Sequence, residues 1–273
     1  ALIFSILLLI TWITLHALPS YYWAKTYDVS IRDEATFVEL DGGNFVVVGR
    51  SQNNGNDDME IVKLNPQGIV IWHKSLDASD YNQIATSVLV DGNDYAVAGY
   101  GTVDPDLEHD VIVAKLTSGG TLQWSNAYSL GRGNEYLSSI CKIENEYYLV
   151  GHTYIYTSSP VDHLSDIFVM KINTEGDHIL TKIFYHTDND IASCATPTSP
   201  ALTKGVIAIT GTVYPGPFGL HDVYVILLDA NLNKVWGYIY SLGGDAARES
   251  EDYAECIRAT SDGGFVVTGF TNQ

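Results

Sequence analysis

The sequence predicts an all-β chain of tandem repeats, and three observations support that fold class. Its 273 residues include 24 Gly and 18 Tyr but only 17% charged residues, a composition that favours strands and tight turns over helices. Tryptophan recurs in one local context at intervals of 49, 52, 56 and 56 residues, with one leucine in its place: Trp23, Trp72, Trp124, Leu180 and Trp236. Each interval contains four short apolar segments separated by turn residues, which is typical of a repeated unit of antiparallel strands.

The four expected strands of a repeat can be followed in order. The first follows an alanine or its equivalent, as in ATFVELDGG from Ala35, and the second ends at a glycine, as in NFVVVG up to Gly49. The third opens at an aspartate, as in DMEIVKL from Asp58, and the fourth carries the repeated tryptophan, as in NPQGIVIW up to Trp72. Gly, Asn and Asp at the joints supply the positive φ and local hydrogen bonds that tight hairpins need.

The two middle strands of each repeat are apolar almost throughout, which predicts burial on both faces. The blades of a β-propeller stack face against face and bury their strands in this way, whereas the strands of a sandwich alternate polar and apolar residues. We therefore expect a β-propeller of four-stranded antiparallel blades, with four full repeats and a partial fifth, rather than a sandwich or an open solenoid. The expected propeller domain is 20–273, with repeats at about 23–72, 73–124, 125–180, 181–236 and a partial 237–273.

The last repeat shows no third strand before Gln273, while a lone strand of the fourth type surrounds Trp23. We expect either a C-terminal continuation of the propeller or a closed five-bladed ring with one thin blade.

The first 18 residues, ALIFSILLLITWITLHAL, carry no charge and end at Pro19. Their length lies between that of a signal-peptide core and that of the shortest membrane-spanning helix. We expect a short apolar N-terminal helix within residues 1–19 that acts as a signal peptide or, alternatively, as a membrane anchor. This segment predicts an extracellular or cell-surface location.

Net charge and cysteine content limit the classes of ligand and metal that the chain is expected to bind. The formal net charge of -19 disfavours nucleic acid as a partner. Cys141, Cys194 and Cys256 are odd in number and lack CxxC spacing, so they indicate neither a zinc site nor a disulfide framework. We expect Cys194 and Cys256, at matching positions of two first strands, to be small buried hydrophobic residues.

Several segments resemble a known family. WAKTYD, ATFVELDGGNFVVVGRS and SEDYAECIRATSDGGFVVTGFT resemble the secreted SBBP-like propeller repeats and, more distantly, PQQ-type blades. The resemblance extends from about Trp23 onward and implies a secreted, mostly uncharacterised propeller without a defined activity. Leu180 in place of a tryptophan, and the interruption at Pro197–Thr203, depart from the pattern and predict irregular third and fourth blades.

The connections between second and third strands differ in length and character among the repeats, whereas the hairpins are uniform. Variable loops on a fixed scaffold predict the binding face. Aromatic residues in the longest of these loops are the predicted contacts for a glycan or protein ligand, and anchoring of the loops is their alternative role. These residues are Tyr154, Tyr156, Tyr214 and Phe218.

Four carboxylates precede the innermost strand at equivalent positions of their repeats, and Gln83 takes the place of the fifth. A ring of carboxylates would supply the oxygen ligands that Ca²⁺ prefers. The alternative is that each carboxylate accepts hydrogen bonds from the backbone of its own loop. The four residues are Asp33, Glu135, Asp190 and Asp252.

Lysines at positions 63, 115 and 171 stand five residues after the aspartate that opens the third strand, an odd offset that places the two on opposite strand faces. We expect these lysines to form salt bridges between blades.

No HExxH, GxSxG, Walker or dinucleotide-binding motif is present, so no catalytic residue is assigned and no cofactor is required. The sequence favours an exported module that binds or scaffolds a surface glycan or protein. One alternative is a carbohydrate-active propeller enzyme, a glycosidase or lyase, that uses two of the four carboxylates. Another is a structural subunit of a cell-surface or pilus-like assembly, anchored by residues 1–18.

Overall fold

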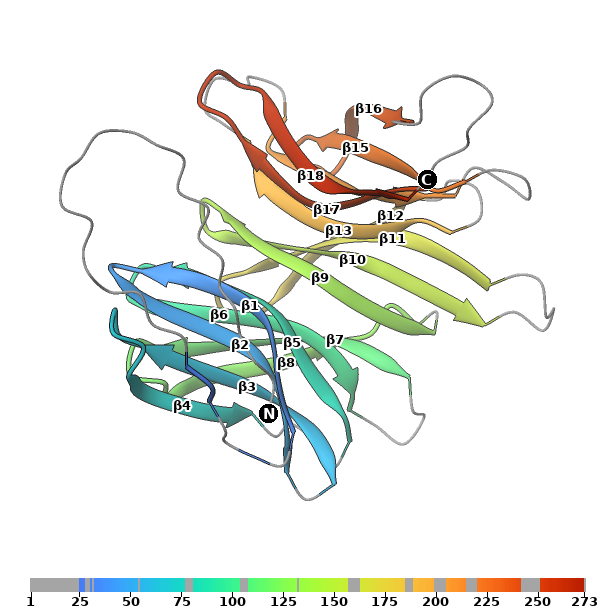
Figure 1. The fold of residues 1–273 in the computed structure, drawn as a ribbon. Coiled ribbons are helices and arrows are strands. Elements are labelled where there is room, and N and C mark those ends of the chain that lie inside the picture. The colour runs from blue at the N-terminus through green and yellow to red at the C-terminus, as the bar shows by residue number, and fades with distance from the viewer. Residues whose placement is uncertain are drawn as a thin grey trace.

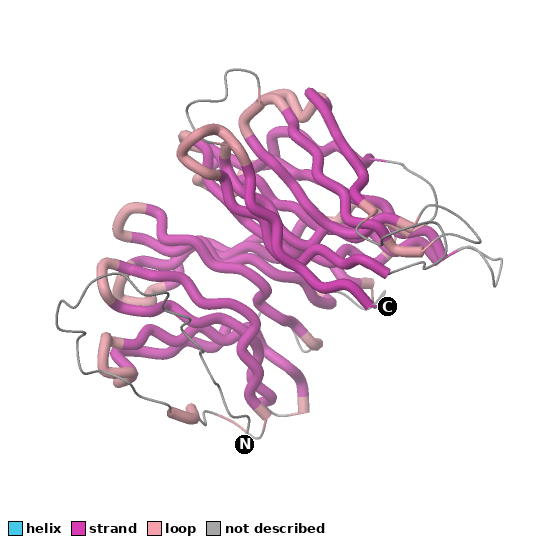
Figure 2. The backbone as a smooth tube through the Cα atoms, turned by 45° about the horizontal axis from the view of Figure 1, so that its top comes forward, coloured by secondary structure: helices cyan, strands magenta, loops and turns pink. Residues whose placement is uncertain are grey.

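The computed structural model of the chain describes residues 25–27, 30, 32–53, 55–76, 81–103, 108–131, 133–156, 163–184, 189–198, 205–214, 220–241 and 251–272. These residues form strands and turns only (Figure 2). A helix with the length and apolarity to cross a bilayer is therefore not found among them. The N-terminal helix predicted within residues 1–19 lies outside the described residues.

In the described part of the chain, 18 strands form five antiparallel sheets, each built from strands consecutive in sequence. The first sheet contains β1 (Asp33–Asp41), β2 (Asn44–Asn53), β3 (Asn56–Leu64) and β4 (Val70–Leu76). The second contains β5 (Gln83–Asp91), β6 (Asp94–Thr102), β7 (His109–Thr117) and β8 (Leu122–Tyr128). The third contains β9 (Asn134–Ile143), β10 (Glu146–Tyr156), β11 (His163–Asn173) and β12 (His178–Phe184). The fourth contains β13 (Ile191–Pro197), β14 (Ile207–Val213), β15 (Asp222–Leu228) and β16 (Lys234–Tyr240), and the fifth contains β17 (Glu251–Ala259) and β18 (Phe265–Asn272).

The predicted repeat of four-stranded antiparallel units is confirmed, and the partial fifth repeat forms a two-stranded sheet. The third and fourth sheets keep all four strands despite their departures from the repeat pattern. The interruption after Pro197 has a local effect only, because β13 ends at that proline. Proline has no backbone N–H and cannot continue the hydrogen-bonded ladder.

Successive sheets stack face against face, from the blue first sheet to the red fifth (Figure 1). Neighbours along β6 show why the middle strands lack alternation. Val97 belongs to the core between the first and second sheets, whereas Ala96 and Ala98 belong to the core between the second and third. Both faces of the strand are therefore buried, as expected for stacked propeller blades.

The recurring glycine was expected to end each second strand, but it lies within the strand, since β2 continues to Asn53 and β6 to Thr102. This glycine is required for space. A Cβ added to Gly99 would lie 1.9 Å from the carbonyl oxygen of Ile84 in β5. The pairing register shifts beside this contact, between Ala85 and Ser87, which marks a β-bulge. Corresponding distances at the other four glycines are 1.9 to 2.2 Å: Gly49, Gly151, Gly211 and Gly269. The bulged first strand thus presses a carbonyl group against the second strand in every sheet.

In the first and second sheets, the repeated tryptophan donates a hydrogen bond to the hairpin turn between the third and fourth strands of the next sheet. The indole Nε1 of Trp72 donates to the carbonyl of Ser118 at 3.0 Å, and Trp124 Nε1 donates to that of Thr174 at 3.3 Å. The hydroxyl of Tyr128 donates to the carbonyl of Gly176, and that of Tyr27 donates in the same way to Gly68. Residues 25–27 therefore contact the first sheet in the same way as the end of β8 contacts the third sheet, through a tyrosine hydroxyl that donates to a turn glycine.

The expectation of salt bridges between blades is wrong, since all three lysines pair with a carboxylate of their own sheet: Lys63 with Asp41, Lys115 with Asp91 and Lys171 with Glu146. The Nζ of Lys63 lies 2.9 Å from Asp41, and the hydroxyl of Tyr95 in the next sheet lies 2.7 Å from both groups. The same arrangement recurs one sheet later with Asp91, Lys115 and Tyr147. At the first two ion pairs the neighbouring sheet thus supplies a tyrosine hydroxyl, whereas the hydroxyl that donates to Glu146 belongs to Tyr148 of the same sheet.

Candidate functional site

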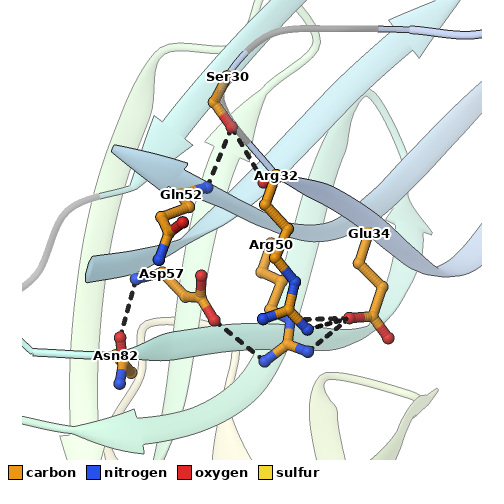
Figure 3. A network of polar contacts seen from close by, with 7 residues as sticks. All are labelled: Ser30, Arg32, Glu34, Arg50, Gln52, Asp57 and Asn82. Atoms are coloured by element: carbon orange, nitrogen blue, oxygen red, sulfur yellow. Dashed lines mark hydrogen bonds and ion pairs between the residues drawn. The ribbon is translucent and has the colours of Figure 1, made fainter. Parts of the chain in front are cut away.

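The predicted binding face corresponds to the loop end of the sheets, where second strands lead into third strands and first strands begin. The contacts between neighbouring sheets are called seams here. At the first seam Arg50 lies between two carboxylates (Figure 3): its Nη2 is 2.5 Å from Glu34 and its Nη1 is 3.0 Å from Asp57. The backbone N–H of Asp57 donates to the side-chain oxygen of Asn82 at 2.9 Å, which joins the first sheet to the second.

At the second seam aromatic and imidazole rings contact one another. We call these residues the Tyr136 cluster: Tyr100, His109, Tyr136 and His152. Tyr136 of the third sheet lies 5.0 Å from Tyr100 and 5.3 Å from His109, measured between ring centroids. It also stacks on His152 at 5.3 Å. Burial lowers the pKa of His109, and it lowers that of His152 to about 4, so both rings are neutral at pH 7.

The fourth seam carries a second group of rings, the Tyr253 cluster of Tyr214, His221, Glu251, Tyr253 and Phe270. Tyr253 stacks between His221, at 4.9 Å, and Phe270, at 4.7 Å with an interplanar angle of 18°. Tyr214 contacts the other side of His221 at 5.2 Å. The Tyr253 hydroxyl lies 3.1 Å from His221 Nδ1 and donates to Glu251 at 3.3 Å. Phe270 is 54% exposed and lies on β18, the last strand that the structure describes, while Glu251 at the loop end has 38% of its side chain exposed.

The two clusters occupy equivalent positions of the repeat. Tyr136 and Tyr253 each stand between a buried carboxylate and a buried apolar residue of the first strand, Glu135 and Leu137 or Asp252 and Ala254. His109 and His221 each precede the aspartate of the third strand. The recurrence of tyrosine and histidine at fixed repeat positions is the sequence signal that could have indicated the two ring clusters.

The predicted aromatic contacts fall into two groups. Tyr214 belongs to the Tyr253 cluster, and Tyr154, at the loop end of β10, is partly buried opposite Asn134 of β9. The side chain of Tyr156 and all of Phe218 lie outside the described residues. Their assignments as ligand contacts therefore stay predictions.

The four predicted metal-binding carboxylates lie at the start of their inner strands. Asp33 accepts hydrogen bonds from the backbone N–H and the hydroxyl of Ser30, which matches the alternative role as a loop cap. Glu135, Asp190 and Asp252 are almost completely buried. The backbone N–H groups of the last two donate across seams, Asp190 to the carbonyl of Ser165 and Asp252 to that of His221, both at 2.7 Å.

Within the described residues no three His, Cys, Asp or Glu side chains come close enough together to hold a metal ion. At Asp190 and Asp252 this position has a structural role, because its backbone N–H fastens the inner strand to the preceding sheet. Calcium binding by these residues stays a prediction.

The inner strands of all five sheets surround a cavity of about 350 Å³. Its wall comes from the half of these strands nearer the hairpins: Phe37, Glu39, Ser87–Val90, Ser139–Lys142, Cys194–Pro197 and Arg258. The basic groups at this wall have partners already, because Lys142 pairs with Asp91 and Arg258 donates to Cys194 and to the carbonyl of Ile257. The cavity lies on the axis expected for a propeller, at the end opposite the ring clusters.

Comparison with protein families and with the sequences of curated proteins gives no match. Solved structures with a similar fold include a subtype N10 neuraminidase-like protein of A/little yellow-shouldered bat/Guatemala, with 10% identity and a TM-score of 0.45 over 80% of this chain and 70% of the other. A Bombyx mori GH32 beta-fructofuranosidase has 10% identity and a TM-score of 0.44 over 84% and 53%. A Synechocystis apocarotenoid oxygenase has 8% identity and a TM-score of 0.47 over 79% and 48%. This chain thus spans about half the length of the last two proteins, and similarities at this level carry no argument about its activity.

Proposed function

We propose that this chain is a propeller module that binds a glycan at the Tyr253 cluster. The observation that carries the proposal is the stack of His221, Tyr253 and Phe270, with the partly exposed carboxylate of Glu251 beside it at the loop end. The apolar faces of sugar rings pack on aromatic rings, and their hydroxyl groups need hydrogen-bonding partners beside the stacking surface. The Tyr253 cluster combines both.

The polar groups of this surface are suited to sugar hydroxyls. Glu251 has 38% of its side chain exposed and lies 3.8 Å from His221 Nδ1, whose side chain is 28% exposed. A partly exposed carboxylate accepts hydrogen bonds from hydroxyl groups without the desolvation cost of a buried charge. Tyr253 holds the carboxylate through its own hydroxyl, so the acceptor is oriented before the ligand arrives.

Binding is favoured over glycoside hydrolysis. Hydrolysis requires two carboxyl groups that reach the scissile bond, one on each side of it. Glu135, Asp190 and Asp252 are at most 1% exposed and lie beneath the loop end, so they do not offer such a pair to a ligand on the surface.

The setting of this activity is part of the same proposal. Export to the cell surface rests on the apolar segment 1–18, and the resemblance to secreted SBBP-like repeats agrees with it. The predicted loop residues Tyr154, Tyr156 and Phe218 would extend the contact beyond the Tyr253 cluster. A protein ligand at the same rings is the alternative occupant.

A glycan array followed by calorimetric titration of the strongest hit tests the proposal. Phe270→Ala removes the stacking face, and we expect it to weaken binding about fivefold, since an aromatic contact contributes about 1 kcal/mol beyond its area and 1.4 kcal/mol is a factor of ten. Val266→Ala is the matched control, because Val266 lies on the same strand and is also 54% exposed. Absence of any glycan hit, or binding by Phe270→Ala within twofold of the unaltered protein, would contradict the proposal.

A further inference from the structure

Two of the three cysteines meet across the fourth seam. Cys194 lies in β13 and Cys256 in β17, the inner strands of the fourth and fifth sheets, and their Sγ atoms are 3.4 Å apart. Each cysteine directly follows the register shift of its own strand, so the two occupy the same place in their sheets. The expectation that both are isolated hydrophobic residues is therefore incomplete, since they form a pair of free thiols in contact.

The surroundings of this pair are polar on one side. Cys194 and Arg258 both line the axial cavity, and Arg258 Nη1 lies 3.4 Å from the Cys194 sulfur. Cys256 is partly exposed, whereas Cys194 is 8% exposed. Burial and the neighbouring Cys194 raise the pKa of the Cys256 thiol, and the Arg258 guanidinium opposes that rise by stabilising the thiolate, which is the form that attacks a disulfide. The pair thus has an accessible member, a buried member and a nearby cation.

The third cysteine provides an internal comparison. Cys141 lies in β9 of the third sheet and is part of the core between the third and fourth sheets. Burial, with a contribution from Cys194, raises the pKa of the Cys141 thiol to about 12. A thiol of this kind is almost entirely protonated near neutral pH and reacts slowly with disulfides.

We infer that Cys194 and Cys256 are an oxidative modification site that forms a disulfide between the fourth and fifth sheets. The oxidant is a small-molecule disulfide such as oxidised glutathione. The Cys256 thiolate attacks one sulfur of it, breaks its S–S bond and releases one glutathione thiolate. The Cys194 thiolate then attacks Cys256 Sγ in the mixed disulfide and releases the second. Two protein thiols and one glutathione disulfide give one protein disulfide and two glutathione thiols, which receive the two protons.

The geometry requires only a small movement. A disulfide has an S–S distance of about 2.05 Å, so the sulfur atoms, 3.4 Å apart, must approach by roughly 1.4 Å. The new bond would join residues 62 positions apart and fasten the two-stranded fifth sheet, whose shared core with the fourth sheet is the smallest of the four inter-sheet cores. This inference is independent of glycan binding and holds whether or not a glycan binds.

The experiment uses the full chain, first reduced and then incubated with excess oxidised glutathione at pH 8. We expect the free thiols counted after denaturation to fall from three to one, and a non-reducing peptide map to join the Cys194 and Cys256 peptides. The oxidised protein should melt at a higher temperature than the reduced protein. Cys141→Ala should leave the crosslink intact, while Cys256→Ser should abolish both the crosslink and the difference in Tm.

Three results would overturn the inference: all three thiols remaining free under conditions that oxidise dithiothreitol, a crosslink that includes Cys141, or a disulfide that forms only between two chains. The thiol count and the peptide map are made on the unaltered protein, so they do not depend on whether a variant folds. They also do not depend on a glycan ligand, so failure of the glycan proposal would leave them unchanged.

Discussion

The recurring glycine of the second strand, Gly99 in β6, offers a direct test of the repeat architecture. In Gly99→Ala the new Cβ would lie 1.9 Å from the carbonyl oxygen of Ile84 and 2.8 Å from the Cα of Ala85. Real Cβ atoms do not approach other atoms closer than 3.0 Å, so β5 and β6 would have to separate by about 1.1 Å at this point. Both obstructing atoms belong to the backbone, and rotation of a side chain cannot relieve the contact.

The expected loss of stability follows from three contributions. Separation of the strands weakens about two ladder hydrogen bonds at about 1 kcal/mol each, and overpacking adds about 1 to 3 kcal/mol. The reduced freedom of alanine in the unfolded chain offsets about 0.4 to 1 kcal/mol. We therefore expect Gly99→Ala to lower the free energy of unfolding by about 2 to 4 kcal/mol.

Equilibrium unfolding in urea, followed by far-UV circular dichroism, measures this loss. Gly119→Ala is the matched control, because it lies in the turn of the same sheet, has no positive φ, and its added Cβ would meet nothing closer than Thr117 Oγ1 at 3.9 Å. That control should be neutral or stabilise the protein by up to about 1 kcal/mol. A Gly99→Ala protein within 0.5 kcal/mol of the unaltered one, on the order of the usual scatter for a neutral surface change, would refute the close-approach argument.

Changes at the seams and at the carboxylates have defined outcomes as well. Burial gives His152 a pKa of about 4 in the folded protein, against an ordinary value of 6.5, so the unfolded chain binds a proton first as the pH falls. The free energy of unfolding should therefore decrease between pH 6.5 and 4 by at most about 3 kcal/mol. His152→Gln should make the urea midpoint less dependent on pH, whereas His178→Gln, at an exposed position, should not, and equal pH dependence of the two variants would contradict the assignment. Tyr147→Phe removes the hydroxyl that donates to Asp91 and should cost about 1 to 2 kcal/mol in urea unfolding, compared with no change for the exposed Tyr240→Phe; a neutral Tyr147→Phe would exclude a contribution of that hydrogen bond. If the four carboxylates bind calcium, chelation should lower Tm and Asp190→Asn should abolish that effect, whereas a Tm that chelation leaves unchanged would contradict calcium binding.

The sheets could be predicted from sequence because each is made from consecutive strands. Local signals are sufficient for such a unit: a glycine or asparagine at each hairpin, an aspartate at the third strand, and unbroken apolar runs in the middle strands. The recurring glycines were attributed to positive φ at the joints. Gly49 and Gly99 do not have positive φ, however, and the structure explains them by the approach of a neighbouring carbonyl group. This requirement depends on a β-bulge in the first strand, which apolar patterning does not show.

The ring clusters and the thiol pair could not be predicted in the same way, because each joins residues of two sheets. His221 and Tyr253 are 32 residues apart, and Cys194 and Cys256 are 62 apart. A single sequence places these residues at equivalent repeat positions, but it does not show which side chains meet across a seam. The lysines illustrate the same limit, since Lys63 pairs with Asp41 at the far end of its own sheet and not with a neighbouring blade.

The loop end at the fourth seam is the proposed glycan-binding surface. Hydrogen–deuterium exchange of the full chain, with and without the strongest glycan from the array, tests this claim without any substitution. We expect the ligand to slow amide exchange at the loop ends of β15, β17 and β18, near His221, Tyr253 and Phe270. Exchange in the inner strands around the axial cavity should not change. Protection confined to those inner strands at the hairpin end, or to no segment at all, would contradict the proposal.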